Sequence, residues 1–112
     1  MTSTLHILYF AIGLLCAPRY WTRGTGSVKA EDFEGRPVGP GSWKASKWTL
    51  VGAIVAAYRV EGAKERNIKE ALDLLTEAAG TTNLSDFNME SEWADVVQVL
   101  HTAIKKEIEA ND

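Results

Sequence analysis

The chain has 112 residues and a mass of 12.3 kDa, which is room for one domain and too little for two separate hydrophobic cores. Hydrophobic residues make up 46% of the chain and charged residues 24%, values that argue against a disordered tail, a collagen-like repeat and a coiled coil. The formal net charge of −3 argues against a protein that coats nucleic acid through bulk positive charge.

The first predicted element is an apolar helix over residues 4–17, with Thr4 as its N-cap and Pro18 ending it. The side chains of this helix are apolar on nearly all of its faces, so we expect the helix to lie at the centre of the fold. The run is shorter than the roughly 20 residues of a membrane span, and no basic residue precedes it as in a secretory signal. We therefore expect a cytoplasmic protein whose only cysteine, Cys16, is a buried, reduced thiol outside any disulfide or zinc site.

Glycine and proline dominate residues 22–42, where helical periodicity is lost. Within this segment, the sequence Asp32-Phe33-Glu34-Gly35 is typical of a reverse turn with a positive φ at Gly35. Residues 26–30 and 36–38 flank the turn. The segment therefore predicts a small two-stranded hairpin or an ordered loop, because a long loop without structure is unusual inside a compact domain.

The second predicted helix starts near Ser42 or Ser46 and ends at about Tyr58. Its apolar residues keep helical spacing. Gly52 and Ala56 form a stripe of small residues on this helix. We expect that stripe to let another helix approach closely.

Two further helices complete the predicted fold. Residues 67–79 form the third helix, with Asn67 as its N-cap in a capping box. Residues 91–108 form the fourth helix, capped by Ser91, and residues 109–112 form a frayed tail. The expected fold class is mainly α: a single domain over residues 1–112, with four helices and the hairpin or ordered loop between the first two.

Recognisable catalytic chemistry is missing from the sequence. It holds no Walker loop, no dinucleotide-binding glycine motif, no zinc-protease motif and no EF-hand loop. The two histidines, His6 and His101, are more typical of partly buried structural residues than of catalytic ones. We therefore predict no catalytic residues, no metal site, no cofactor and no enzyme activity.

Four tryptophans are many for so short a chain. Trp48 and Trp93 share helical faces with apolar residues and are predicted to lie in the core. Trp21 and Trp43 flank the glycine-rich segment, where they either clamp it onto the helices or line a cleft. Stacking of bases on tryptophan beside Arg23 would suit single-stranded nucleic acid, but the acidic total argues against that partner.

Charge is distributed unevenly along the chain. Residues 1–60 carry seven basic and three acidic side chains, a net charge of +4. Residues 84–112 carry two basic and seven acidic side chains, a net charge of −5. Such asymmetry can steer a partner to one face, or the two ends can attract one another within the fold.

Two functions from different classes remain open. The first is a non-enzymatic protein that binds another protein, such as a bacterial accessory protein or a phage-encoded inhibitor. The second is a small-molecule or nucleotide site under the glycine-rich segment, with Trp21 and Trp43 as walls, Arg23 and Arg36 as anion contacts and Asn88 as a polar anchor. Arg36 could instead pair with Asp32 or Glu34 and only hold the hairpin.

Four motifs occur in a fixed order along the chain. They are Trp21-Thr22-x-Gly24, Ala30-x-Asp32-x-x-Gly35-Arg36-Pro37-Val38, Ala45-x-x-Trp48-x-Leu50-x-Gly52-Ala53-Ile54 and Leu84-x-x-Phe87-Asn88. This order resembles a family of small bacterial and phage proteins known as a domain of unknown function. The chain departs from the family pattern at Thr49, where cysteine is frequent, and at Met89, where aspartate is common. The resemblance implies a shared architecture and leaves the function open.

Overall fold

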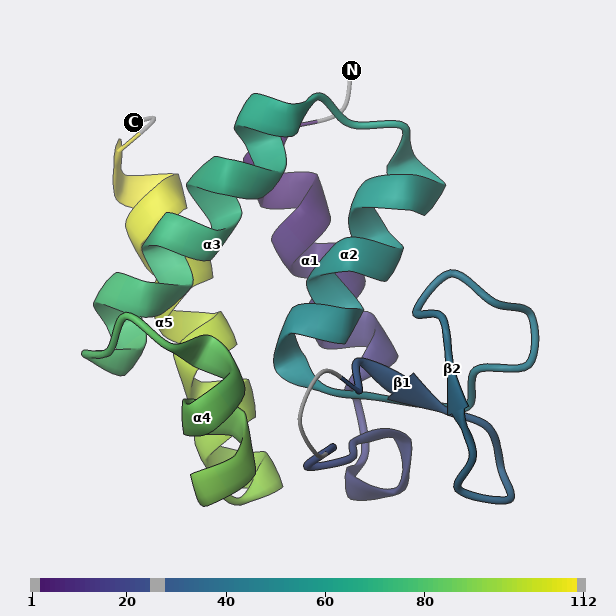
Figure 1. Cartoon of the computed structure of the whole chain (residues 1–112). Coiled ribbons are helices and arrows are strands. Elements are labelled where there is room, and N and C mark those ends of the chain that lie inside the picture. The colour runs from purple at the N-terminus through teal and green to yellow at the C-terminus, as the bar shows by residue number, and fades with distance from the viewer. Residues whose placement is uncertain (1–2, 25–27, 111–112) are drawn as a thin grey trace.

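The computed structural model describes residues 3–24 and 28–110 (Figure 1). Helices make up most of it, which confirms the predicted mainly α class, but five α-helices are present where four were predicted. The elements in chain order are α1 (Thr4–Leu14), the 3₁₀ helix η1 (Pro18–Tyr20), β1 (Ala30–Glu31), β2 (Pro37–Val38), β3 (Lys47–Trp48), α2 (Leu50–Glu61), α3 (Glu65–Ala79), α4 (Leu84–Glu90) and α5 (Trp93–Ala110).

Helix α1 lies at the centre of the helical layer, as its all-round apolar sequence predicts. It packs against α2, α3 and α5, while α4 packs against α2 and α3 (Figure 1). Ile7, Leu8 and Ala11 of α1 are fully buried and meet Leu75 of α3 and Leu100 of α5 in one hydrophobic core. No helix within the described ranges has both the length and the apolar character that a membrane span requires.

The glycine-rich segment contributes β1 and β2 to a three-stranded antiparallel sheet in the order β2-β1-β3, and β3 follows the segment. In its register, Ala30 lies opposite both Val38 and Trp48. The predicted hairpin is thus present as β1 and β2, and Gly35 in its turn has the expected positive φ of 84°. Residues 26 and 27 of the predicted hairpin lie outside the described residues.

Strand β3 occupies residues that the sequence assigns to the second helix. Helix α2 therefore begins at Leu50, and the predicted start near Ser42 or Ser46 is wrong. The reason is that Lys47 and Trp48 pair with β1, after which Thr49 caps α2 by accepting a hydrogen bond from the Gly52 N–H at 3.0 Å.

Two helix starts and one helix end also differ from prediction. Helix α1 is capped by Ser3 and ends at Leu14, so Cys16 lies beyond it and is exposed; the prediction of a buried thiol is wrong. Helix α3 begins two residues before Asn67, whose Oδ1 accepts a hydrogen bond from the Lys64 N–H at 3.3 Å. Asn67 therefore contributes to the N-terminal cap of α3 from within the first turn of that helix.

Helix α4 is the element that the sequence did not predict. Asn83 caps it by accepting a hydrogen bond from the Asp86 N–H at 3.0 Å, and Ser91 ends it. The last helix, α5, consequently begins at Trp93 and not after Ser91. It continues to Ala110, so the first half of the predicted frayed tail is helical, and residues 111–112 lie outside the described part of the chain.

Gly52 lets α2 approach the backbone just before strand β1. A Cβ atom at Gly52 would stand 1.9 Å from the carbonyl oxygen of Lys29, and the Thr49 N–H donates to that same oxygen at 3.0 Å. The predicted role of Gly52 in a helix–helix contact is therefore wrong. The close approach joins the helical layer to the sheet.

We predict that Gly52→Ala lowers the free energy of unfolding by more than about 2 kcal/mol, because a rigid backbone atom occupies the space of the added methyl group. Gly13→Ala is the matched control, since nothing lies within 4 Å of its added Cβ; we expect it to be neutral or stabilising by up to about 1 kcal/mol. Urea unfolding of both variants measures the difference. Equal effects at the two positions would contradict the close approach.

Candidate functional site

The five predicted site residues lie in two separate places. Trp21, Arg23 and Asn88 come together where α4 meets the start of α2. Arg36 and Trp43 instead line a hollow on the two turns that project beyond the sheet, at the right of Figure 1. The expected single cleft under the glycine-rich segment is therefore divided between a buried cluster and an exposed surface.

Asn88 is the centre of the buried cluster, with only 1% of its surface exposed. Its Oδ1 accepts hydrogen bonds from Trp21 Nε1 at 2.7 Å and from the Leu50 N–H at 3.1 Å. Its Nδ2 donates to the carbonyl oxygens of Thr22 at 3.1 Å and Arg23 at 2.9 Å. These four bonds use both donors of the amide and two acceptor positions, so Asn88 connects three segments of the chain and has no donor left for a ligand.

The other members of this cluster are also engaged within the fold. The Arg23 guanidinium lies 5.2 Å from the centre of the Trp21 ring and forms an ion pair with Glu92 at 2.7 Å. The space enclosed beside them has a volume of about 10 Å³, which is room for about one water molecule. Its lining residues are Arg23, Val28, Thr49, Val51, Ser85, Asn88 and Met89. As the described residues enclose it, this space is too small for a nucleotide or metabolite.

Trp43 has the opposite environment, since 89% of its surface is exposed. It cannot clamp the glycine-rich segment onto the helices, and that interpretation is wrong for this residue. Phe33 is 82% exposed at the tip of the neighbouring turn, and sequence reasoning did not single it out. The remaining tryptophans are partly buried: Trp48, on β3 and not on a helix, donates to the Pro40 carbonyl at 3.0 Å, and Trp93 donates to the Leu15 carbonyl at 2.8 Å.

Phe33, Arg36, Trp43 and Lys44 form the surface that we call the aromatic edge. Together with Asp32 they line an open hollow of about 330 Å³. Two turns carry these side chains: residues 32–36 connect β1 to β2, and residues 39–46 lead towards β3. The edge therefore combines two exposed aromatic rings with two cationic side chains.

Asp32 holds the first turn in one conformation. Its Oδ1 accepts hydrogen bonds from the backbone N–H groups of Glu34 and Arg36, both at 2.9 Å, and its Oδ2 accepts from Arg36 Nε at 3.0 Å. The Arg36 backbone N–H is the main cause that lowers the pKa of the Asp32 carboxyl, and the Arg36 side chain and the Glu34 N–H lower it further against the opposing effect of burial. Phe33 is thus exposed on a turn that is bonded from within.

Local hydrogen bonds also define the second turn. The Ser42 N–H donates to the Gly39 carbonyl at 3.0 Å, and the Lys44 N–H donates to Ser42 Oγ at 3.1 Å. The Ser46 N–H donates to the Glu31 carbonyl at 2.9 Å, which ties this turn to β1. Trp43 stands at the outer side of the turn, where the Lys44 ammonium lies 5.5 Å from its ring centre.

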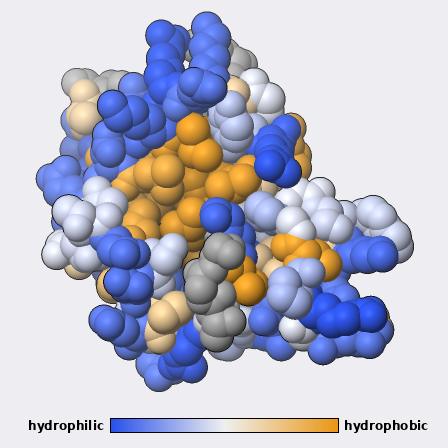
Figure 2. All heavy atoms as spheres, in the orientation of Figure 1, coloured by the Kyte–Doolittle hydropathy of each residue, from blue (hydrophilic) through white to orange (hydrophobic). Residues whose placement is uncertain are grey.

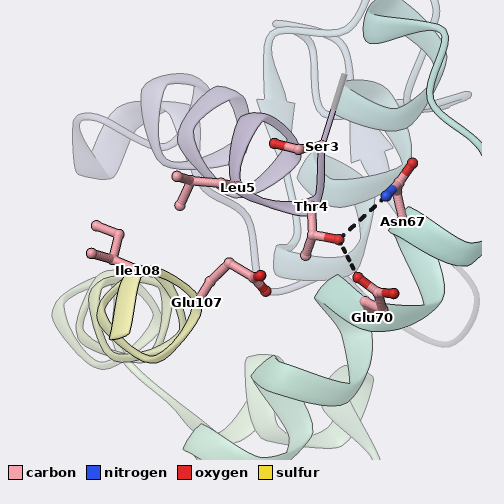
Figure 3. A pocket seen from close by; sticks show the side chains of 7 residues that line it. All are labelled: Ser3, Thr4, Leu5, Asn67, Glu70, Glu107 and Ile108. Atoms are coloured by element: carbon pink, nitrogen blue, oxygen red, sulfur yellow. Dashed lines mark hydrogen bonds between the residues drawn. The ribbon is translucent and has the colours of Figure 1, made fainter. Parts of the chain in front are cut away.

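A second hollow, of about 430 Å³, lies between the start of α1, the start of α3 and the end of α5 (Figure 3). The buried Thr4 hydroxyl donates to Glu70 Oε2 at 2.7 Å and accepts from Asn67 Nδ2 at 3.5 Å. These polar groups bind one another and so join α1 to α3. In the described part of the chain, no three histidine, cysteine, aspartate or glutamate residues gather in a way that could hold a metal ion.

Apolar residues also gather in the middle of the face shown in Figure 2, over the region where α2 and α3 lie in Figure 1. Val51 of α2 and Leu72 of α3 line an open hollow of about 250 Å³, next to Leu84. Both side chains are partly buried and pack against the hydrophobic core. This area is the outer margin of the core, and it lacks the exposed aromatic side chains of the aromatic edge.

We predict that Asn88→Ala lowers the free energy of unfolding by about 3–5 kcal/mol, because the variant leaves the buried Leu50 N–H and Trp21 Nε1 without their acceptor. Gln98→Ala, at an exposed position of α5, is the control and should change stability by less than about 0.5 kcal/mol. Thermal and urea unfolding measure both. A loss below about 1 kcal/mol for Asn88→Ala would show that the cluster is dispensable.

We predict a pH-dependent stability difference between the protein and its Asp32→Asn variant. The folded protein lowers the Asp32 pKa below 3.8, so the ionised carboxylate stabilises the fold above that pH. The difference should therefore be constant from about pH 7 to pH 5 and should shrink as the pH falls through the lowered pKa. Urea unfolding at each pH measures it, with Glu109→Gln at the exposed end of α5 as the control. A difference that grows on acidification would contradict the assigned hydrogen bonds.

The comparisons with known proteins concern the family and not the activity. No curated protein matches the chain. No solved structure matches it. Residues 1–106 match a family described as the family of unknown function DUF6197. Since the match covers nearly the whole chain, the protein belongs to the DUF6197 family.

Proposed function

We propose that this protein is a non-enzymatic module that binds another protein through the aromatic edge. The observation that carries the proposal is the exposure of Phe33 and Trp43, 82% and 89%, on two turns that are hydrogen-bonded from within. Exposed large aromatic side chains next to arginine are the residue types that dominate binding energy at protein interfaces.

The physical cost of this arrangement supports a binding role. Each exposed ring keeps a large apolar area in water, and the bonded turns prevent the rings from folding back onto the core. A partner that covers the rings recovers this hydrophobic free energy. Because the turns are already ordered, association would cost little additional backbone entropy.

A small-molecule ligand is the second candidate function, and one observation favours it. The 330 Å³ hollow between Phe33 and Trp43 is within the range of volumes that ligand pockets occupy, about 300–1,000 Å³. The hollow is open to solvent and shaped by exposed side chains, whereas ligand pockets usually enclose most of the ligand. A protein surface fits this geometry better than a metabolite does.

The proposal extends to the setting in which the module acts. By covering the surface of another protein, it would serve as a bacterial accessory protein or as a phage-encoded inhibitor. We place it in the cytoplasm, where the exposed Cys16 thiol stays reduced.

We predict that a protein partner is captured by the wild-type chain and lost with the double variant Phe33→Ser/Trp43→Ser. The control is Tyr9→Ser/Val60→Ser, which removes two other exposed apolar side chains, 48% and 65% exposed. Each immobilised protein is incubated with lysate of the native host, and bound proteins and metabolites are identified by mass spectrometry. We expect one protein, in stoichiometric amount, on the wild type and the control.

Two results would contradict the proposal. The first is recovery of the same proteins on the wild type and on the Phe33→Ser/Trp43→Ser variant. The second is a metabolite that copurifies with the wild type and no bound protein. Circular dichroism of each variant establishes that the loss is not caused by unfolding, since all four replaced side chains are exposed.

A further inference from the structure

We infer that the aromatic edge binds an acidic segment of its protein partner, in which an apolar side chain stands next to one or more carboxylates. The inference rests on the proposed function and adds the chemistry of the partner. Its support is the charge around Trp43, because Phe33 itself stands between Asp32 and Glu34, whose carboxylates are paired with Arg36.

The chain separates its charges between two parts of the fold. Residues 1–60 carry a net charge of +4, and residues 61–112 carry five basic and twelve acidic side chains, a net charge of −7, which together give −3. The aromatic edge lies in the basic part, and α3, α4 and α5 make up most of the acidic part. The sheet region itself, residues 28–48, carries four basic and three acidic side chains, a net charge of +1, so an approaching acidic segment is weakly attracted to it and is repelled by α3, α4 and α5.

The immediate surroundings of Trp43 are cationic. The segment of residues 39–46 contains Lys44 and no acidic residue. The Arg59 side chain lies against the same segment, with its Cδ 3.3 Å from the place of a Cβ at Gly41. Within the described residues, neither Lys44 nor Arg59 forms an ion pair. Both cations are thus available to carboxylates of a partner.

Arg36 has a different part in the same surface. Its Nε and Nη2 are engaged by Asp32 at 3.0 Å and Glu34 at 3.1 Å, so its charge is largely compensated inside the turn. The Arg36 side chain nevertheless remains 68% exposed and forms one side of the hollow. Lys44 is therefore the residue of the aromatic edge whose charge selects the partner, and Arg36 shapes the hollow.

The geometry assigns separate roles to the rings and to the cation. An apolar side chain of the partner enters the hollow between Phe33 and Trp43, where burial of the rings supplies most of the affinity. The Lys44 ammonium stays beside the Trp43 ring through a cation–π contact, so a carboxylate next to that apolar side chain meets it at the rim. Charge at the rim contributes mainly to orientation and to the rate of association.

Two other occupants of this surface are outcomes of the test. Single-stranded nucleic acid also stacks on aromatic rings beside cations, but a chain with a net charge of −3 repels it as a whole. A second copy of this protein could place its acidic helices against the edge. Both would require the same side chains, so the experiment includes a probe for each.

The first experiment selects peptides from a displayed library of random 12-residue sequences, using the wild-type protein. Counter-selection against Phe33→Ser/Trp43→Ser removes peptides that bind elsewhere. We expect the recovered peptides to be enriched, relative to the starting library, in aspartate or glutamate next to leucine, isoleucine or phenylalanine. Recovery of neutral or basic peptides would overturn the inference and leave the proposed function intact. Recovery of no peptide that distinguishes the variant would count against the proposed function itself.

The second experiment titrates the most enriched peptide by isothermal titration calorimetry. We expect Lys44→Glu to weaken binding at least about tenfold, and the control Lys105→Glu, on the exposed side of α5, to leave it within about twofold. Raising the salt concentration from 50 to 500 mM should also weaken binding by the wild type. Unchanged affinity of Lys44→Glu would overturn the inference.

Two controls address the alternative occupants. A 12-nucleotide oligothymidylate is titrated under the same conditions, and we expect binding at least about a hundredfold weaker than that of the peptide. Sedimentation velocity of the free protein is expected to give a monomer at micromolar concentration. Equal affinity for the oligonucleotide, or a dimer that Lys44→Glu dissociates, would overturn the assignment of an acidic partner segment.

Discussion

The hydrogen bonds of the Asn88 carboxamide are the interaction that holds the segments outside the helical layer in place. It connects α4 to residues that precede it by 38 to 67 positions, and it does so in the interior. The bond to the Leu50 N–H fixes the first turn of α2, and Thr49 and β3 immediately precede that turn. Since β1 and β2 pair outward from β3, these hydrogen bonds contribute to the position of the whole sheet.

A close approach of two backbones completes the connection between the helical layer and the sheet. Gly52 brings α2 against the carbonyl of Lys29, which also accepts the Thr49 N–H. The sheet is only two residues long in each strand, too short to be stable alone. Its order therefore comes from its attachment to α2 and η1, and this attachment lets two turns extend into solvent with defined conformations.

The aromatic edge has the reverse of the environment found in the core. The core buries Leu8, Leu75 and Leu100 completely, whereas Phe33 and Trp43 lie almost entirely in water. The hydrogen bonds of Asp32 and of residues 39–46 hold the two turns in shape, and they leave the two rings exposed to solvent. Such an arrangement lowers the stability that the chain could otherwise reach, and the proposed binding of a partner would account for it.

Sequence reasoning predicted the features that depend on local pattern. The apolar character of α1 and the positive φ at Gly35 both follow from spacing and from the conformational preferences of single residues. Strand β3 could not be predicted, because Lys47 and Trp48 are extended only through pairing with β1. Helix α4 could not be predicted either, because it has only seven residues and is held by packing against α2 and α3.

The candidate site was predicted in part for the same physical reason. The hypothesis of a ligand site under the glycine-rich segment pointed to Trp21, Arg23 and Asn88, but whether these residues bind a ligand or one another depends on distances that no local pattern contains. Phe33 did carry a signal, since an aromatic residue in the middle of a turn between polar residues has no obvious place in a core. Turn position was therefore the better guide to exposure than residue type.

The aromatic edge is a fixed surface before any partner binds, because both of its turns are hydrogen-bonded from within. Nitrogen-15 relaxation of the free protein measures this most directly, through the order parameters of the backbone N–H groups of Phe33, Glu34, Arg36 and Trp43. We expect values of about 0.85, equal to those of the helices, because internal hydrogen bonds hold both turns. Values below about 0.6 at these four positions would contradict it and would show that the two rings are carried on mobile loops.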